Sequence, residues 1–228
     1  MSRRIAIFDL DGTLLHGDTD ELWLKFLIDE GHVDGGQMRA RNDDIQRRYA
    51  EGMASAEEFC FFYLDLLKGH TATELQPLYA KFFDNVVTPK LPRRAFDLVA
   101  MEKSRADVLV MSTATNAFLS APIGRHLGFE HIIATDPGID RKQRFTGGCS
   151  GLPNMRAHKV PRLDAFLAVR GEALSSFDES WFYSDSRNDL PLLRAVTHPV
   201  AVDPDRELEA HAEREGWPVL RMHTDGAA

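Results

Sequence analysis

The sequence predicts an α/β fold in which a doubly wound, Rossmann-like parallel sheet carries an inserted helical segment. Short apolar runs, of the length of buried strands, alternate with helical patterns from residue 92 onward. Such alternation is typical of a parallel sheet covered by helices on both faces. In contrast, residues 16–88 show one helical pattern after another and no strand signal, which suits a small helical bundle.

The first predicted strand is the apolar run that begins at Ile5 and leads into Asp9. Its residues are apolar on both faces, as expected for a strand in the middle of a parallel sheet. The run ends in Asp9-Leu-Asp11-Gly, and open parallel sheets bind ligands at the carboxyl ends of their strands. Because Asp and Gly are also common turn residues, this motif alone leaves an ordinary acidic turn as an alternative.

Three segments of the helical region resemble capping boxes, in which the first side chain bonds to the backbone three residues later. Each precedes apolar residues at helical spacing, and the three are Asp18–Glu21, Ser55–Glu58 and Thr71–Glu74. A further helix is expected from about residue 34 to 52. We therefore expect residues 16–88 to form a helical domain, and residues 1–15 and 89–228 to form the sheet domain.

The second half of the chain supplies the remaining strands and helices of the sheet domain. Strands are expected at residues 107–112, 131–134, 181–183, 200–202 and, at an edge, 218–220. Helices are expected at residues 93–103, 116–128, 155–170, 190–195 and 207–215. Residues 136–154 are rich in glycine and proline, which indicates an irregular excursion with one hairpin.

The charge balance excludes one large class of partners. The 228 residues include 27 Lys and Arg against 35 Asp and Glu, for a formal net charge of −8. A nucleic-acid-binding protein needs a basic footprint, and no run of Lys and Arg is present. A small anionic substrate remains compatible with this composition, because it needs only local positive groups and a metal ion.

Cysteine usage and hydropathy predict the compartment. Cys60 and Cys149 form neither a metal-ligand spacing nor a disulfide framework, which fits a reducing environment. The basic residues at the start precede only four apolar residues, too few for a signal peptide. No apolar run approaches the roughly 20 residues that cross a bilayer. We expect a cytoplasmic protein without membrane or nucleic-acid partners.

Polar residues follow several predicted strands, where one crevice could collect them. Each has an ordinary explanation by itself, because Ser, Thr and Asp commonly cap helices or form turns and a single Lys is usually solvated. The residues are Asp9 and Asp11 after the first strand, Ser112, Thr113 and Thr115 after the second, Asp185 and Asp189 after the strand at 181–183, and Lys159 near the start of a helix.

Together and in this order, these residues resemble the four motifs of the haloacid dehalogenase-like superfamily of hydrolases. The motifs fall on Asp9 to Thr13, on Ser112, on Lys159, and on Asp185 with Asp189. The resemblance covers the chain from Ile5 to about Asp203. The position of the helical region, between the first and second motifs, resembles the cap domain of phosphoserine phosphatase and its relatives.

The resemblance implies a role for each motif residue in phosphoryl transfer. Asp9 would attack phosphorus and form an aspartyl-phosphate, which divides one difficult displacement into two easier ones. Asp11 would protonate the leaving alkoxide and then take a proton from the hydrolytic water. Ser112 and Lys159 would contact the phosphoryl oxygens, with Thr113 beside them, because the charge on those oxygens must be neutralised.

A Mg²⁺ site is also implied by the resemblance. Its ligands would be Asp9, Asp185 and the backbone carbonyl of Asp11, which are hard oxygen donors of the kind Mg²⁺ prefers. Asp189 would hold a metal-bound water or orient Lys159.

The expected activity is hydrolysis of a small-molecule phosphomonoester. Phosphoserine phosphatases carry Glu nine residues after the nucleophile, where this chain has Asp18. Asp18 would select an ammonium-bearing substrate such as phosphoserine or histidinol phosphate, or it would only cap a helix. Ser112-Thr-Ala and Tyr183-Ser-Asp185 depart from the phosphoserine phosphatase motifs and resemble a sister group that includes some histidinol-phosphate phosphatases. A phosphotransferase or mutase, or a catalytically silent binding protein, remains an alternative.

Overall fold

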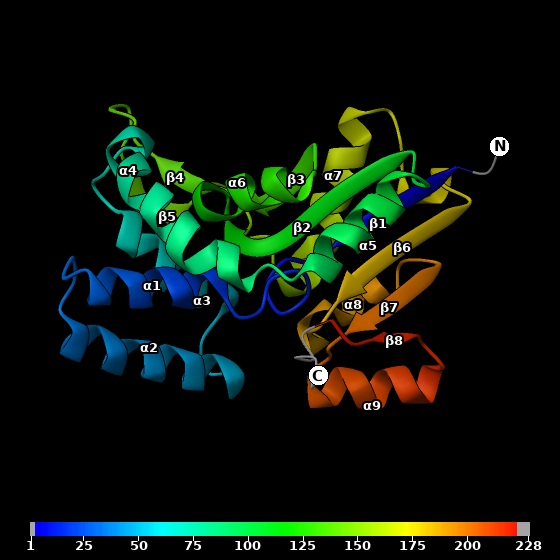
Figure 1. Ribbon diagram of the computed structural model, residues 1–228, viewed down its shortest axis with the longest axis horizontal. Helices are drawn as coiled ribbons and strands as arrows, with labels where there is room; N and C mark the ends of the chain where they lie inside the picture. Colours follow the sequence, from blue (N-terminus) through cyan, green and yellow to red (C-terminus); the bar gives the residue numbers. More distant parts are fainter. Residues whose placement is uncertain (1–2, 223–228) are drawn as a thin grey trace.

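The computed structural model describes residues 3–222, and its centre is a six-stranded parallel sheet. The strands lie in the order β3-β2-β1-β6-β7-β8, and every neighbouring pair is parallel (Figure 1). Their bounds are β1 Arg4–Phe8, β2 Val108–Asn116, β3 His131–Thr135, β6 Glu179–Ser184, β7 His198–Val202 and β8 Val219–Leu220. The predicted fold class is confirmed.

The first strand occupies the middle of the sheet because both of its faces are covered. Ile5, Ala6, Ile7 and Phe8 are each fully buried. Ala6 and Phe8 belong to one hydrophobic cluster, and Ile5 and Ile7 belong to another. This alternation follows from the two-residue period of a strand, and it explains why the run is apolar without interruption.

Helices cover the two faces of the sheet. α5 (Arg93–Lys103) and α6 (Ala117–Leu127) contribute buried residues to the cluster of Phe8. α7 (Lys159–Val169), α8 (Leu190–Leu193) and α9 (Arg206–Glu215) contribute to the cluster of Ile7. The structure is therefore doubly wound, with its crevice at the carboxyl ends of the strands.

Four α-helices lie between β1 and α5, as the sequence predicts. They are α1 Thr19–Asp29, α2 Gly35–Ala50, α3 Ala56–Leu64 and α4 Ala72–Phe82. Ser55 and Thr71 cap their helices with reciprocal bonds from Glu58 and Glu74, and Asp18 accepts from the backbone N–H of Glu21. Short π and 3₁₀ turns at Phe83–Val87 and Thr88–Lys90 lead back to α5. The division into two domains stays a prediction.

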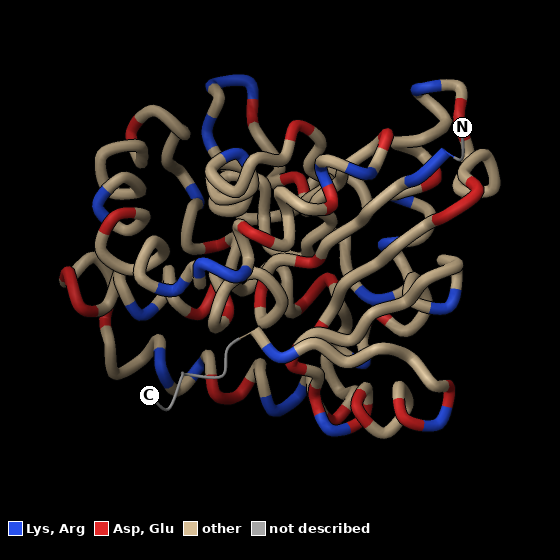
Figure 2. The backbone as a smooth tube through the Cα atoms, turned by 45° about the vertical axis from the view of Figure 1, so that its right-hand side comes forward, with Lys and Arg blue, Asp and Glu red and all other residues tan. Residues whose placement is uncertain are grey.

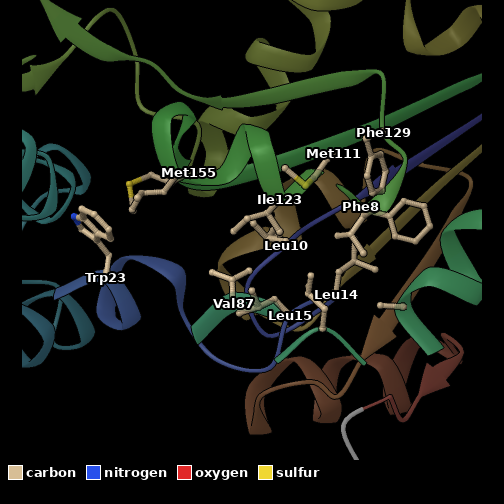
Figure 3. Packing of buried hydrophobic residues seen from close by; sticks show 14 of the residues in the cluster. Phe8, Leu10, Leu14, Leu15, Trp23, Val87, Met111, Ile123, Phe129 and Met155 are labelled. Carbon is tan, nitrogen blue, oxygen red and sulfur yellow. The ribbon is translucent and has the colours of Figure 1, made fainter. Parts of the chain in front are cut away.

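One hydrophobic cluster extends from the sheet into the helical insert. Phe8, Leu10 and Ile123 lie near the sheet, and Trp23 packs at the far end of the same cluster (Figure 3). The Trp23 ring lies 5.0 Å from that of Phe82, edge to face. The insert is therefore packed on the sheet through apolar contacts.

Two boundaries differ from the sequence prediction by four residues. β2 runs on to Asn116 instead of ending at Ser112, because its pairing with β3 shifts register and then resumes. The helix predicted from residue 155 begins with a 3₁₀ turn at Arg156–His158, so that α7 starts at Lys159. The predicted hairpin consists of β4 (Pro137–Ile139) and β5 (Phe145–Cys149), and β5 contacts α3.

Figure 2 shows Lys and Arg positions interspersed with Asp and Glu positions along the backbone. Among residues 3–222, no helix combines the length and the apolar character that crossing a bilayer requires.

Candidate active site

A cavity of about 310 Å³ lies at the carboxyl ends of β1, β2 and β6, under the start of α1 and the facing parts of α2 and α3. Its wall includes nearly all of the residues that the sequence motifs single out. These are Asp9, Asp11, Asp18, Thr113, Thr115, Lys159, Asp185 and Asp189.

Lys159 joins two acidic residues in the floor of the cavity. Its Nζ lies 2.8 Å from Asp9 Oδ1 and 2.6 Å from Asp189 Oδ2, and the lysine is 2% exposed. Burial alone lowers the pKa of Lys159, but the charges of Asp189 and Asp9 outweigh burial and raise it above its usual value. The amine is therefore a permanent cation between the two carboxylates.

Asp9 is held by the strand that precedes it. Its backbone N–H donates to the Tyr183 carbonyl at 2.9 Å, which continues the pairing of β1 with β6. Burial raises the pKa of Asp9 to about 7, although Lys159 opposes the shift. A carboxylate in a desolvated position beside a cation suits a nucleophile.

Thr13 and Gly12 shape the turn that brings Asp185 against Asp9. Thr13 Oγ1 donates to Asp185 Oδ1 at 3.1 Å and accepts from the Asp185 N–H at 3.0 Å. Gly12 has a φ of +72°, and a Cβ at this position would lie 2.1 Å from Asp185 Oδ2. The Gly-Thr that follows the two acidic residues is therefore required by geometry, and the alternative of an ordinary acidic turn does not explain it.

Asp11 is fixed by hydroxyl groups from two directions. Its Oδ1 accepts from the N–H of Thr19 at 2.8 Å and from the Thr19 hydroxyl, and its Oδ2 accepts from Thr115 Oγ1 at 2.6 Å. Burial and the charge of Asp18 raise the pKa of Asp11 to about 6, against these hydrogen bonds. A carboxyl group that titrates near neutrality suits proton transfer.

Ser112 and Thr113 are neighbours in β2, and only one of them reaches the cavity. Ser112 is fully buried and its hydroxyl accepts from Asn154 Nδ2 at 3.1 Å. Thr113 lines the cavity. Ser112 is not among the lining residues, and its expected contact with a phosphoryl group stays a prediction.

Several cavity residues are absent from the sequence motifs. Tyr49 and Phe59 stack with their ring centroids 4.2 Å apart, and the Arg156 guanidinium lies 3.9 Å from the Tyr49 ring centroid. Both rings stand at the helical spacing of core residues, which gives no sign in the sequence that they line a cavity. Asp20, in the first turn of α1, also lines the cavity and accepts from Asn116 Nδ2 at 3.1 Å.

The cavity carries an excess of negative charge. Six aspartates face one lysine and two arginines. Burial, followed by the charges of Asp9 and Asp189, raises the pKa of Asp185 well above its usual value. These carboxylates repel one another, and a bound cation would relieve the repulsion. No group of three or more His, Cys, Asp or Glu side chains within residues 3–222 is arranged to hold a metal by itself.

Comparisons with known proteins agree with this geometry. Residues 6–194 match the family model of the haloacid dehalogenase-like hydrolases. A histidinol-phosphatase of Neisseria meningitidis serogroup C is 38% identical over 220 residues, which are 96% of this chain and 99% of the relative.

Solved structures show the same fold. A protein of unknown function from Bordetella pertussis Tohama I has a TM-score of 0.92 at 43% identity, covering 96% of this chain and 99% of that one. A substrate-bound phosphoserine phosphatase has a TM-score of 0.68 at 15% identity, covering 96% and 93%. The motifs, the fold and these relatives together show that the chain belongs to the haloacid dehalogenase-like hydrolase family, as one of its phosphatases.

Proposed function

We propose that this phosphatase hydrolyses a small amine-bearing phosphomonoester through an aspartyl-phosphate on Asp9, and that histidinol phosphate is its substrate. The observation that carries the reaction is the position of Asp9 at the end of β1, bonded to the buried Lys159 amine in a cavity that also holds Asp185 and Thr113.

The two half-reactions follow from the contacts of the acidic residues. Asp9 forms a bond to phosphorus while the ester oxygen leaves, and Asp11 gives that oxygen its proton. Asp11 then accepts a proton from the water that attacks the aspartyl-phosphate, which releases inorganic phosphate and restores Asp9. The Lys159 amine and the Thr113 hydroxyl donate to the phosphoryl oxygens. Because Asp189 Oδ2 accepts from Lys159 and from Ser184, its role is to orient the lysine.

The carboxylates fit the Mg²⁺ ion that the family implies, since their mutual repulsion calls for a cation. Asp9, Asp185 and the Asp11 carbonyl would hold the ion, which supplies charge neutralisation for the phosphoryl group when bound.

Removal of divalent cations is expected to abolish turnover of p-nitrophenyl phosphate. Mg²⁺ added back in excess of the chelator should restore the wild-type kcat. Ca²⁺ should inhibit, because its larger and looser coordination shell disturbs in-line geometry. A steady-state assay titrated with each ion provides the measurement, and full activity in excess chelator would contradict the metal assignment.

The preference for an amine rests on the part of the cavity that α1, α2 and α3 line. Asp18 and Asp20 lie there with the stacked rings of Tyr49 and Phe59. Burial, followed by the charges of Asp18 and Asp11, raises the pKa of Asp20 well above its usual value. An ammonium group beside these acids would offset the repulsion between their carboxylates. Histidinol phosphate offers both an ammonium group and a planar ring, and the Neisseria relative is a histidinol-phosphatase.

Replacement of these acids by their amides tests the substrate. Asp18→Asn keeps the N-cap, because Asn caps about as well as Asp, and Asp20→Asn keeps the size of the side chain. Each variant is expected to raise KM for histidinol phosphate at least tenfold more than KM for p-nitrophenyl phosphate, which has no ammonium group. An equal change for both substrates, or no change for either, would leave Asp18 and Asp20 as structural residues. Parallel assays on phosphoserine establish which amine is preferred.

A further inference from the structure

The end of β2 departs from regular pairing beside the active site. Ser112 pairs with Ile133 of β3, and the next pair joins Asn116 to Thr135. Residues 113–115 of β2 therefore stand opposite a single residue of β3. Such a bulge bends a strand and re-aims its side chains, and bulges are frequent next to active sites.

Two buried side chains replace the hydrogen bonds that the bulge removes from the sheet. Asn154 Nδ2 donates to the Thr113 carbonyl at 2.9 Å and to the Ile133 carbonyl at 3.0 Å. Thr135 Oγ1 donates to the Ala114 carbonyl at 2.7 Å and accepts from the Asn154 N–H at 2.9 Å. Asn154 and Thr135 are fully buried. Since buried carbonyls require donors, these two side chains fix the shape of the bulge.

The Asn154 amide contacts the bulge through its NH₂ group and not through its oxygen. Asn154 Oδ1 is buried and has no hydrogen-bond partner within the described chain. The opposite orientation would place this oxygen against two carbonyl groups. In the observed orientation Asn154 Oδ1 stays without a hydrogen bond, while the NH₂ group donates to both carbonyls of the bulge.

The bulge carries the groups of β2 that reach the reacting atoms. Thr115 Oγ1 donates to Asp11 Oδ2 at 2.6 Å, and the Thr115 N–H donates to Thr113 Oγ1 at 3.2 Å. Thr113 itself lines the cavity. Asn154 also lies on the segment that precedes α7, the helix that begins at Lys159. Its hydrogen bond to Thr113 therefore connects this segment to the end of β2.

We infer that Asn154 and Thr135 are positioning residues for phosphoryl transfer, which act through the bulge on Thr113 and Thr115 and do not touch the substrate. This inference rests on the proposed function, in which Thr113 binds the phosphoryl group and Asp11 is the general acid. Asn154 and Thr135 both lie outside the four family motifs.

Isosteric substitutions provide the test. Asn154→Asp keeps the shape but replaces a donor by an acceptor, and Thr135→Val removes only the hydroxyl. Both variants are expected to lower kcat for p-nitrophenyl phosphate at least tenfold, and Thr135→Ser should recover most of the loss because it restores the hydroxyl.

Ser180→Ala is the matched control. Ser180 is buried at the opposite end of the sheet, where its Oγ accepts from the Thr197 N–H at 2.9 Å, and its loss should leave kcat within twofold.

Hydrogen exchange followed by mass spectrometry gives a readout that does not depend on activity. The peptide that spans residues 110–117 should exchange faster in Asn154→Asp and Thr135→Val than in the wild type or in Ser180→Ala. Unchanged exchange would overturn the inference even if the enzyme proved inactive on every phosphomonoester. Faster exchange with kcat within twofold of the Ser180→Ala control, in a wild-type enzyme that is active, would also overturn it.

Discussion

Asp9→Asn is expected to lower kcat for every phosphomonoester by at least four orders of magnitude, because an amide oxygen is a poor nucleophile and a weaker ligand for Mg²⁺. The fold should survive. Since burial raises the pKa of Asp9 to about 7, the ionised group opposes folding at higher pH, and a neutral amide of the same shape avoids this cost. The Tm of the variant at pH 8 without metal should therefore not fall below that of the wild type.

Steady-state kinetics and a thermal melt measure both parts of this prediction. Asp164→Asn, an exposed position on α7, is the control and should keep the wild-type kcat. Mass spectrometry of acid-quenched protein should detect a phosphoryl adduct in the wild type and none in Asp9→Asn. Wild-type turnover by Asp9→Asn would assign the nucleophile to another residue.

Lys159→Met is expected to have the second-largest effect, and it acts on stability as well as on activity. The substitution leaves Asp9 and Asp189 buried without their shared cation. Removal of one partner from a buried charge cluster costs about 3–5 kcal/mol, and the loss of the amine also removes a donor to the phosphoryl oxygens. We expect a Tm lower by several degrees and no measurable turnover.

The loss of stability in Lys159→Met should decrease as the pH falls, because the pKa of Asp9 is raised in the folded state. A carboxyl group with a higher pKa in the folded state than in the unfolded state binds a proton on folding, so its contribution becomes more favourable as the pH falls. Without the lysine, the pKa of Asp9 rises beyond its value of about 7. The deficit of Lys159→Met in metal-free denaturant titrations should therefore shrink from pH 8 to pH 5. A deficit that stays constant would show that repulsion between buried carboxylates is not its cause.

The positions of the strands and the chemistry of the first motif could be predicted because local patterns determine them. An uninterrupted apolar run requires two covered faces, and β1 has them. The caps at Ser55 and Thr71 are decided within four residues of sequence. Gly12 and Thr13 directly follow Asp9-Leu-Asp11 in the chain, which makes the motif recognisable. Each of these signals lies in neighbouring residues.

Features that depend on distant partners could not be predicted. The bulge in β2 depends on the side chains of Asn154 and Thr135, which come from other segments of the chain. Asn154 stands in an irregular stretch where an isolated amide carries no recognisable signal. Tyr49 and Phe59 have the helical spacing of core residues, and only the packing of α2 and α3 over the strand ends brings them to the cavity.

The central place of β1 has a consequence for the synthesis of the chain. Ile5 pairs with Val108, and Arg4 pairs with Glu179, so the first strand must wait for both of its neighbours to leave the ribosome. At translation rates of about 5–20 residues per second, roughly 9–35 s separate the emergence of β1 from that of β6. The helices of the insert can form during this interval from local contacts. The cavity, which needs the ends of β1, β2 and β6, therefore forms only after β6 has been synthesised.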